Sequence, residues 1–117
     1  MSDSIGETAE SVVKATTSQF VDQEFDVFRV PYVKSKEQVD KVMAEAAAEK
    51  AMVCYTIVLP ELRQHLADKA MELDVKVVDV LGPMLRVIEG NWGLLPKNQA
   101  GLIHSLDHEY FKRVEAV

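Results

Sequence analysis

Hydroxyl and carboxylate side chains crowd the first eight residues of this chain. Ser4 followed three residues later by Glu7 has the spacing of a capping box, which predicts the start of a helix at this point. Free backbone N–H groups at such a start, together with the positive end of the helix dipole, can hold a phosphate group. The residues that could contribute to a phosphate or substrate site are Ser2, Asp3, Ser4, Gly6, Glu7 and Thr8. The pattern alone leaves two interpretations open, an ordinary helix cap and a ligand contact.

A second candidate group lies near the other end of the chain, where His104 and Arg113 flank a helical pattern. An arginine can contact an anion through two N–H groups, and a histidine can give or take a proton near neutral pH. We therefore treat His104 and Arg113 as candidate phosphate or substrate ligands. The alternative is a solvated helix surface with ion pairs such as Glu109 to Arg113.

Trp92 is a candidate interaction residue, because it stands between Gly90 and Gly93 in a segment that reads as a loop. Tryptophan is enriched among the residues that dominate protein interfaces. Three interpretations remain open: an anchor for a partner, a lid over the core of the domain, or part of a surface that another domain covers.

The histidines and the single cysteine give no signal for a metal site. Three histidines and one cysteine are present, without the H-x-x-x-H or C-x-x-C spacing of zinc ligands, so we expect no metal in this chain. His65 and His108 are expected to be solvated on helix surfaces. Cys54 lies in the apolar run Met52-Val53-Cys54-Tyr55, which is typical of a buried strand.

Composition narrows the functional classes. The chain has 117 residues, 48% of them hydrophobic, which is enough for one globular domain. A net charge of −6 argues against binding to nucleic acid or to a membrane surface, since both require a positive field. Without a secretory signal or a long apolar span in the sequence, we expect a cytoplasmic protein.

The apolar spacing switches repeatedly between the helical and the strand period, which predicts an α/β fold. A helical stripe (Ala9, Val12, Val13, Thr16, Phe20) comes first. The expected elements that follow are a strand over 25–30, a helix from the capping box of Ser35 and Gln38, a buried strand over 51–59, a helix from Pro60, a strand over 75–80, a short helix from Gly82 to about Gly90, a loop over 90–102 and a last helix from Ser105.

If a strand preceded Ser2, the alternation would be regular and would form a parallel sheet flanked by helices. We therefore expect a Rossmann-like or flavodoxin-like three-layer arrangement whose first strand is missing. Ligands bind such sheets at the carboxyl ends of the strands. The turns 2–8, 58–60 and 81–83 should then gather at one edge.

Five segments resemble the regulatory proteins of pyruvate, phosphate dikinase and phosphoenolpyruvate synthase. They are Met1 to Glu10, Val30-Pro31-Tyr32-Val33, Tyr55 to Arg63, Asp79 to Leu85 and His104 to Ala116. The resemblance implies a bifunctional regulator that phosphorylates a threonine of the dikinase with ADP. It implies that the same protein removes this phosphate with inorganic phosphate, releasing pyrophosphate. It also implies a divalent cation accompanying the nucleotide.

The chain departs from that family in two respects. The family has a short apolar strand leading into its Ser-Asp-Ser motif, and here Met1 stands where that strand should end. The family has a Gly-rich nucleotide loop with a Lys followed by Ser or Thr, beyond its Tyr-Phe-Lys-Arg helix, and none of the five glycines here begins such a loop. We therefore expect residues 1–117 to be a single α/β domain, the N-terminal part of such a regulator, without the nucleotide-binding kinase domain, without a cofactor of its own, and inactive alone.

The expected partners are pyruvate, phosphate dikinase or phosphoenolpyruvate synthase. A homodimer is expected as well, because a missing first strand would expose a sheet edge that favours pairing. The alternative function is a non-catalytic dimerisation or partner-docking domain, or a small-anion binder.

Overall fold

The computed structural model describes residues 1–102, so His104, His108 and Arg113 lie outside the described residues. From α2 onward helices and strands alternate as the sequence predicts, and the α/β fold is confirmed. In chain order they are α1 (Glu7–Thr17), α2 (Lys36–Glu49), β1 (Val53–Tyr55), α3 (Pro60–Leu73), β2 (Val77–Asp79) and α4 (Gly82–Trp92).

The sheet is parallel, with Val53 opposite Val77 and Tyr55 opposite Asp79. The first residues of the chain extend it, because Ser2 forms a parallel bridge with Thr56 just beyond β1. On its other side the Ser2 N–H donates to the Val30 carbonyl at 2.9 Å. The start of the chain is thus held between the end of β1 and the segment around Val30. These pairings do not fix a complete strand order, so the Rossmann-like or flavodoxin-like arrangement stays a prediction.

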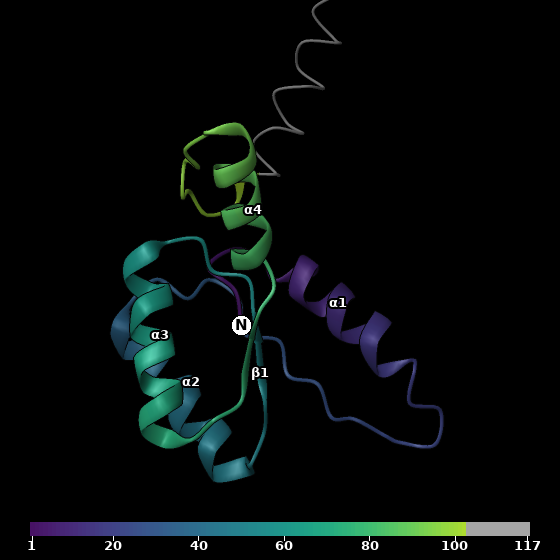
Figure 1. Ribbon diagram of the computed structural model, residues 1–117. Coiled ribbons are helices and arrows are strands. Elements are labelled where there is room, and N and C mark those ends of the chain that lie inside the picture. The colour runs from purple at the N-terminus through teal and green to yellow at the C-terminus, as the bar shows by residue number, and fades with distance from the viewer. Residues whose placement is uncertain (103–117) are drawn as a thin grey trace, which may run out of the picture.

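Helices lie on both sides of the strands. In Figure 1, α2 and α3 stand together on one side and α1 on the other. The helical spacing of Val39, Met43 and Ala46 on α2 places them on one buried face, and α3 buries Leu62, Leu66 and Ala70 in the same way. These two faces meet Ile57 and the β1 side chains in the main core.

The local signals for α2 and α3 are confirmed. Ser35 caps α2 in a capping box with Gln38, and Pro60 occupies the first turn of α3. His65 is not simply solvated as expected. Its Nε2 lies 2.6 Å from Asp40 Oδ1, so it links α3 to α2. No helix within residues 1–102 is long and apolar enough to cross a membrane.

The helix expected near the start of the chain is present as α1, but the cap expected for it is wrong. Ser4 and Glu7 form no capping box: α1 begins at Glu7 with Gly6 at the N-cap position, φ 88°, and no side chain caps it. Of the expected apolar stripe only Ala9 is buried on α1, which ends at Thr17, before Phe20.

The expected strand over 25–30 is wrong as well. No strand forms over 25–30, and Phe25, Val27 and Phe28 are at least half exposed; only Val30, whose carbonyl accepts from the Ser2 N–H, joins this segment to the start of the chain. Its apolar character therefore does not come from burial in a sheet. The stretch from Gly90 was expected to be a loop, but α4 continues to Trp92.

Candidate functional site

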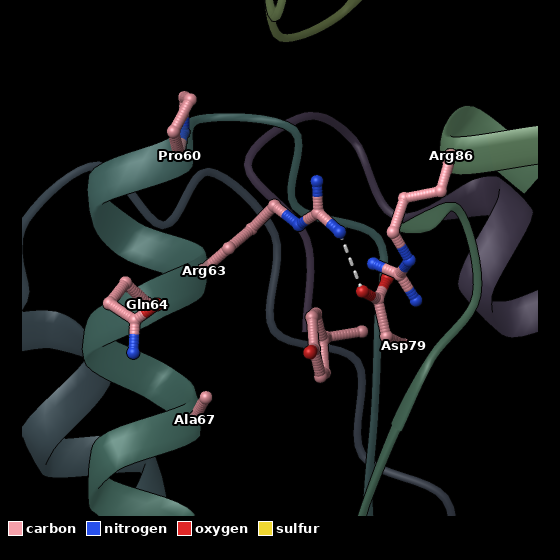
Figure 2. A pocket seen from close by; sticks show the side chains of 7 residues that line it. Pro60, Arg63, Gln64, Ala67, Asp79 and Arg86 are labelled. Atoms are coloured by element: carbon pink, nitrogen blue, oxygen red, sulfur yellow. Dashed lines mark hydrogen bonds and ion pairs between the residues drawn. The ribbon is translucent and has the colours of Figure 1, made fainter. Parts of the chain in front are cut away.

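A polar cleft lies at the carboxyl ends of β1 and β2, the edge where parallel sheets usually bind ligands. Its volume is about 390 Å³. The last residue of each strand, Tyr55 and Asp79, lines it, and α3 and α4 contribute Arg63 and Arg86. Figure 2 shows these side chains together with the remaining lining residues, Pro60, Gln64 and Ala67.

Asp79 lies in the cleft with hydrogen bonds to both of its carboxylate oxygens. Its Oδ2 accepts a hydrogen bond from Arg63 Nη2 at 2.8 Å, and its Oδ1 accepts one from the Gly82 N–H at 2.8 Å. Both side chains of the ion pair are about one-fifth exposed. A carboxylate at the start of α4 also interacts favourably with the helix dipole. Asp79 therefore holds the beginning of α4 and the Arg63 guanidinium in place.

Arg86 is the second cation of the cleft. It lies one turn into α4 beyond Gly82, and Figure 2 shows Arg63 and Arg86 approaching Asp79 from opposite sides. Within residues 1–102 no hydrogen bond or ion pair engages Arg86. Two guanidinium groups face one carboxylate here, so the cleft is locally positive on a chain whose net charge is −6.

Tyr55 adds a hydroxyl to the cleft. Burial raises the pKa of this phenol, and the neighbouring Asp79 carboxylate raises it further, while Arg63 and Arg86 oppose the change. The phenol thus remains protonated at neutral pH, and its single O–H can donate either to Asp79 or to a bound anion. The cleft consequently offers donors from three elements, β1, α3 and α4, to an anion.

The predicted N-terminal candidates lie at the same edge of the sheet, but the first two are engaged internally. Asp3 is buried, and its Oδ2 accepts hydrogen bonds from the N–H groups of Val58, at 2.8 Å, and Leu59, at 3.3 Å. Ser2 is also buried, and its hydroxyl accepts from the Ser4 N–H at 3.0 Å. The Asp3 contacts fix the turn that leads from β1 into α3, and the Ser2 contact shapes the start of the chain.

The remaining candidates of this group surround the start of α1. Gly6 is buried there, whereas Glu7 and Thr8 are exposed. The Arg29 side chain crosses this start, with Nε donating to the Ile5 carbonyl at 2.7 Å and Nη1 3.4 Å from Glu10 Oε2. Their role in binding a ligand stays a prediction.

Trp92 ends α4 and is 64% exposed, which is incompatible with a lid over the core of the described domain. The other two interpretations of Trp92 remain.

His104 and Arg113 fall outside the described residues, so their candidate roles stay predictions. Within residues 1–102 no three His, Cys, Asp or Glu side chains lie close enough together to hold a metal ion.

Sequence reasoning did not single out Arg63, Asp79 and Arg86, which the fold brings together. A signal was present, because Asp79 ends a strand and Arg63 and Arg86 lie in the first turns of the helices that follow strands. Their distance along the chain hides the convergence, which arises only when β1 and β2 pair.

Comparison with known proteins agrees along the whole chain. A family model described as kinase/pyrophosphorylase matches residues 1–117. Relatives from Oceanobacillus iheyensis and Halalkalibacterium halodurans, each 44% identical over 117 residues, are named as pyruvate, phosphate dikinase regulatory proteins. A relative from Alkaliphilus oremlandii with the same name is 42% identical. These alignments cover 100% of this chain but only 42% to 43% of each relative, so the chain spans less than half the length of the relatives it matches.

Proposed function

This chain belongs to the kinase/pyrophosphorylase family, and we propose that it is the N-terminal part of a regulator of pyruvate, phosphate dikinase or phosphoenolpyruvate synthase. In the forward reaction the β-phosphoryl group of ADP moves to a threonine oxygen of the target, AMP leaves, and the hydroxyl proton is released. In the reverse direction an oxygen of inorganic phosphate attacks the phosphothreonine phosphorus. Pyrophosphate leaves and the threonine hydroxyl is restored.

The observation that carries this proposal is the similarity of the whole chain to relatives named as dikinase regulators. The geometry supports it, because polar turns and the two arginines gather at the carboxyl edge of a parallel sheet. A protein that handles phosphorylated groups needs such a concentration of N–H donors, since transition states of phosphoryl transfer spread negative charge over several oxygens.

Within this proposal the nucleotide binds elsewhere in the complete protein. The family's Gly-rich nucleotide loop has no counterpart in residues 1–117, so these residues contribute to binding the target or the attacking phosphate. A divalent cation accompanies ADP, where it offsets the charge on the phosphates. The cytoplasmic location expected from the sequence remains a prediction.

The test uses the complete product of the gene that contains these residues, together with its dikinase. We expect label from the β-position of ADP to appear on one threonine of the dikinase, and added phosphate to release it as pyrophosphate. The 117-residue chain alone should transfer no label, and calorimetry should detect no micromolar ADP binding. A complete protein that neither adds nor removes the phosphate would contradict the proposal, and so would tight ADP binding by the chain alone.

One observation favours the alternative of a dimerisation or docking domain. Apolar side chains on α4 and just beyond it are exposed, among them Met84, Val87, Trp92 and Leu95. An exposed cluster of this kind is common at protein interfaces. If the proposed homodimer forms through it, light scattering should give the mass of a dimer, and V87E should shift the mass toward that of a monomer. A monomer at high protein concentration would count against the homodimer.

A further inference from the structure

The cleft between α3 and α4 presents two cations whose carboxylate partner is already engaged. Asp79 receives one bond from Arg63 and one from the Gly82 N–H, so both of its oxygens have donors. Arg63 uses one terminal nitrogen in that pair, and a guanidinium has five N–H donors. Donor capacity therefore remains on Arg63 after Asp79 is satisfied, and Arg86 has no partner among the described residues.

We propose that the Arg63 and Arg86 side chains bind a phosphate dianion, with the Tyr55 hydroxyl as a third donor. The ligand is either inorganic phosphate or the phosphate of a phosphothreonine side chain. The choice of phosphate over another anion rests on the proposed function, whereas the choice of this cleft rests on its geometry.

The charges favour a doubly negative ligand. Arg63 and Arg86 contribute two positive charges and Asp79 one negative charge, so the cleft is positive by one before a ligand binds. Guanidinium groups are also suited to phosphate, because their planar N–H pairs can contact two of its oxygens at once. The exposure of Arg86 at the surface lets its side chain adjust to an incoming anion.

The pairing with Asp79 positions the Arg63 side chain in the cleft before a ligand binds. Arg63 lies in the first turn of α3, and its pairing with Asp79 limits the rotamers of a long side chain. Binding then costs less conformational entropy than it would with an unrestrained arginine. At about 390 Å³ the cleft has room for a phosphate group and part of the chain that carries it.

A rival position exists at the start of α1, where Arg29 lies over Gly6 and the first N–H groups of the helix have no side-chain cap. Arg29 differs from Arg86 in its surroundings, because it already contacts Ile5 and Glu10. Comparing phosphate binding by R29Q with phosphate binding by R86Q therefore shows at which of the two positions the phosphate binds.

The experiment titrates the 117-residue chain with inorganic phosphate by calorimetry, in a buffer without other multivalent anions. A second titration uses phosphothreonine blocked at both its amino and carboxyl groups. We expect R86Q to weaken binding about tenfold or more, the effect of losing one charge-assisted contact. R63Q should weaken it similarly. K69Q should leave binding unchanged, because Lys69 lies on α3 but pairs with Glu72 outside the cleft.

R86Q decides the outcome, since it leaves the Arg63 to Asp79 pair in place and replaces an exposed side chain. Thermal unfolding followed by circular dichroism confirms that each variant is folded. Binding of inorganic phosphate alone identifies that ion as the ligand, and binding of the blocked phosphothreonine identifies the monoester. Either result supports the proposal if R86Q weakens it.

Three results would overturn the proposal: no binding of either probe at millimolar concentration, equal binding by R86Q and the unmodified chain, or a loss confined to R29Q. The assay separates this proposal from the proposed function. Phosphate binding that depends on Arg86, in a complete protein that does not modify a dikinase, would leave the site in place and remove only the function.

Discussion

Gly82 and Asp79 are in such close contact that no other residue fits at position 82 without movement. A β-carbon at Gly82 would lie 1.9 Å from Asp79 Oδ2 and 2.2 Å from Arg63 Nη2. Real β-carbons essentially never approach other atoms to within 3.0 Å. The glycine therefore makes room for the ion pair at the centre of the cleft, while its N–H binds the same carboxylate.

G82A should disrupt the pair and destabilise the protein. The ends of the Asp79 and Arg63 side chains would have to move, and losing the hydrogen bonds to the Asp79 carboxylate costs about 1–3 kcal/mol in the free energy of unfolding, measured by urea denaturation. G90A is the matched control, because Gly90 is also in α4 and a β-carbon there meets nothing within 4 Å. That change should stabilise the helix by about 0.5–1 kcal/mol. Equal effects of the two changes would show that the contact at Gly82 is unimportant.

Asp3 should contribute to stability through the turn after β1. D3A leaves the N–H groups of Val58 and Leu59 without their acceptor, and we expect a loss of about 1–3 kcal/mol in the free energy of unfolding. D68A, at an exposed carboxylate bonded only to Gln64 among the described residues, should change it by no more than about 0.5 kcal/mol. A stable D3A protein would argue that Asp3 serves a ligand rather than the fold.

Gly6 gives a different kind of prediction. From the sequence, replacing Gly6 by a β-branched residue should weaken binding with little loss of stability if the turn is a ligand site. The same change should lower stability if the turn is only a helix cap. The structure places Gly6 at φ 88°, with Arg29 Nε 3.2 Å from the position of an added β-carbon. G6V should therefore destabilise the protein by at least about 1 kcal/mol whether or not a ligand binds there. An unchanged urea midpoint would contradict the left-handed backbone at Gly6.

The elements that the sequence predicts well are those whose signals are local. The capping box of Ser35 and Gln38 and the proline at position 60 each act within one turn, and both appear where expected. The segment 25–30 has apolar residues too, but a strand requires a neighbour, and no local pattern reveals whether one exists. The cap expected at Ser4 failed for a similar reason, because pairing with Thr56 and Val30 engages the start of the chain.

The cleft illustrates the same limit for function. Arg63 and Asp79 both lie in segments that resemble the regulator family, yet the resemblance assigned no role to either residue. Their contact depends on the register that places Tyr55 opposite Asp79 and on the absence of a side chain at Gly82. Neither can be inferred from spacing along the chain.

The environment of Tyr55 predicts how stability responds to alkaline pH. Burial, and then the Asp79 carboxylate, raise the pKa of Tyr55 above the ordinary value of 10.0. The unfolded chain therefore loses this proton at a lower pH than the folded chain does. The stabilisation is fully present below pH 10.0 and is lost as the pH rises through the higher folded pKa.

Y55F should reduce this alkaline loss, measured as urea midpoints at a series of pH values from about 8 to 11. Y32F is the control, because Tyr32 is about half exposed. Cys54, whose pKa burial also raises from 9.0, is replaced by alanine in every protein compared, so that only the tyrosines differ. Equal alkaline losses in Y55F and Y32F would show that the phenol at position 55 is not held in its protonated form.

In R86Q the pKa of Tyr55 should rise further, since Arg86 is one of the two cations that lower it. Phenolate absorbance, compared with and without Tyr55, measures that shift and reports directly whether Arg86 faces the cleft.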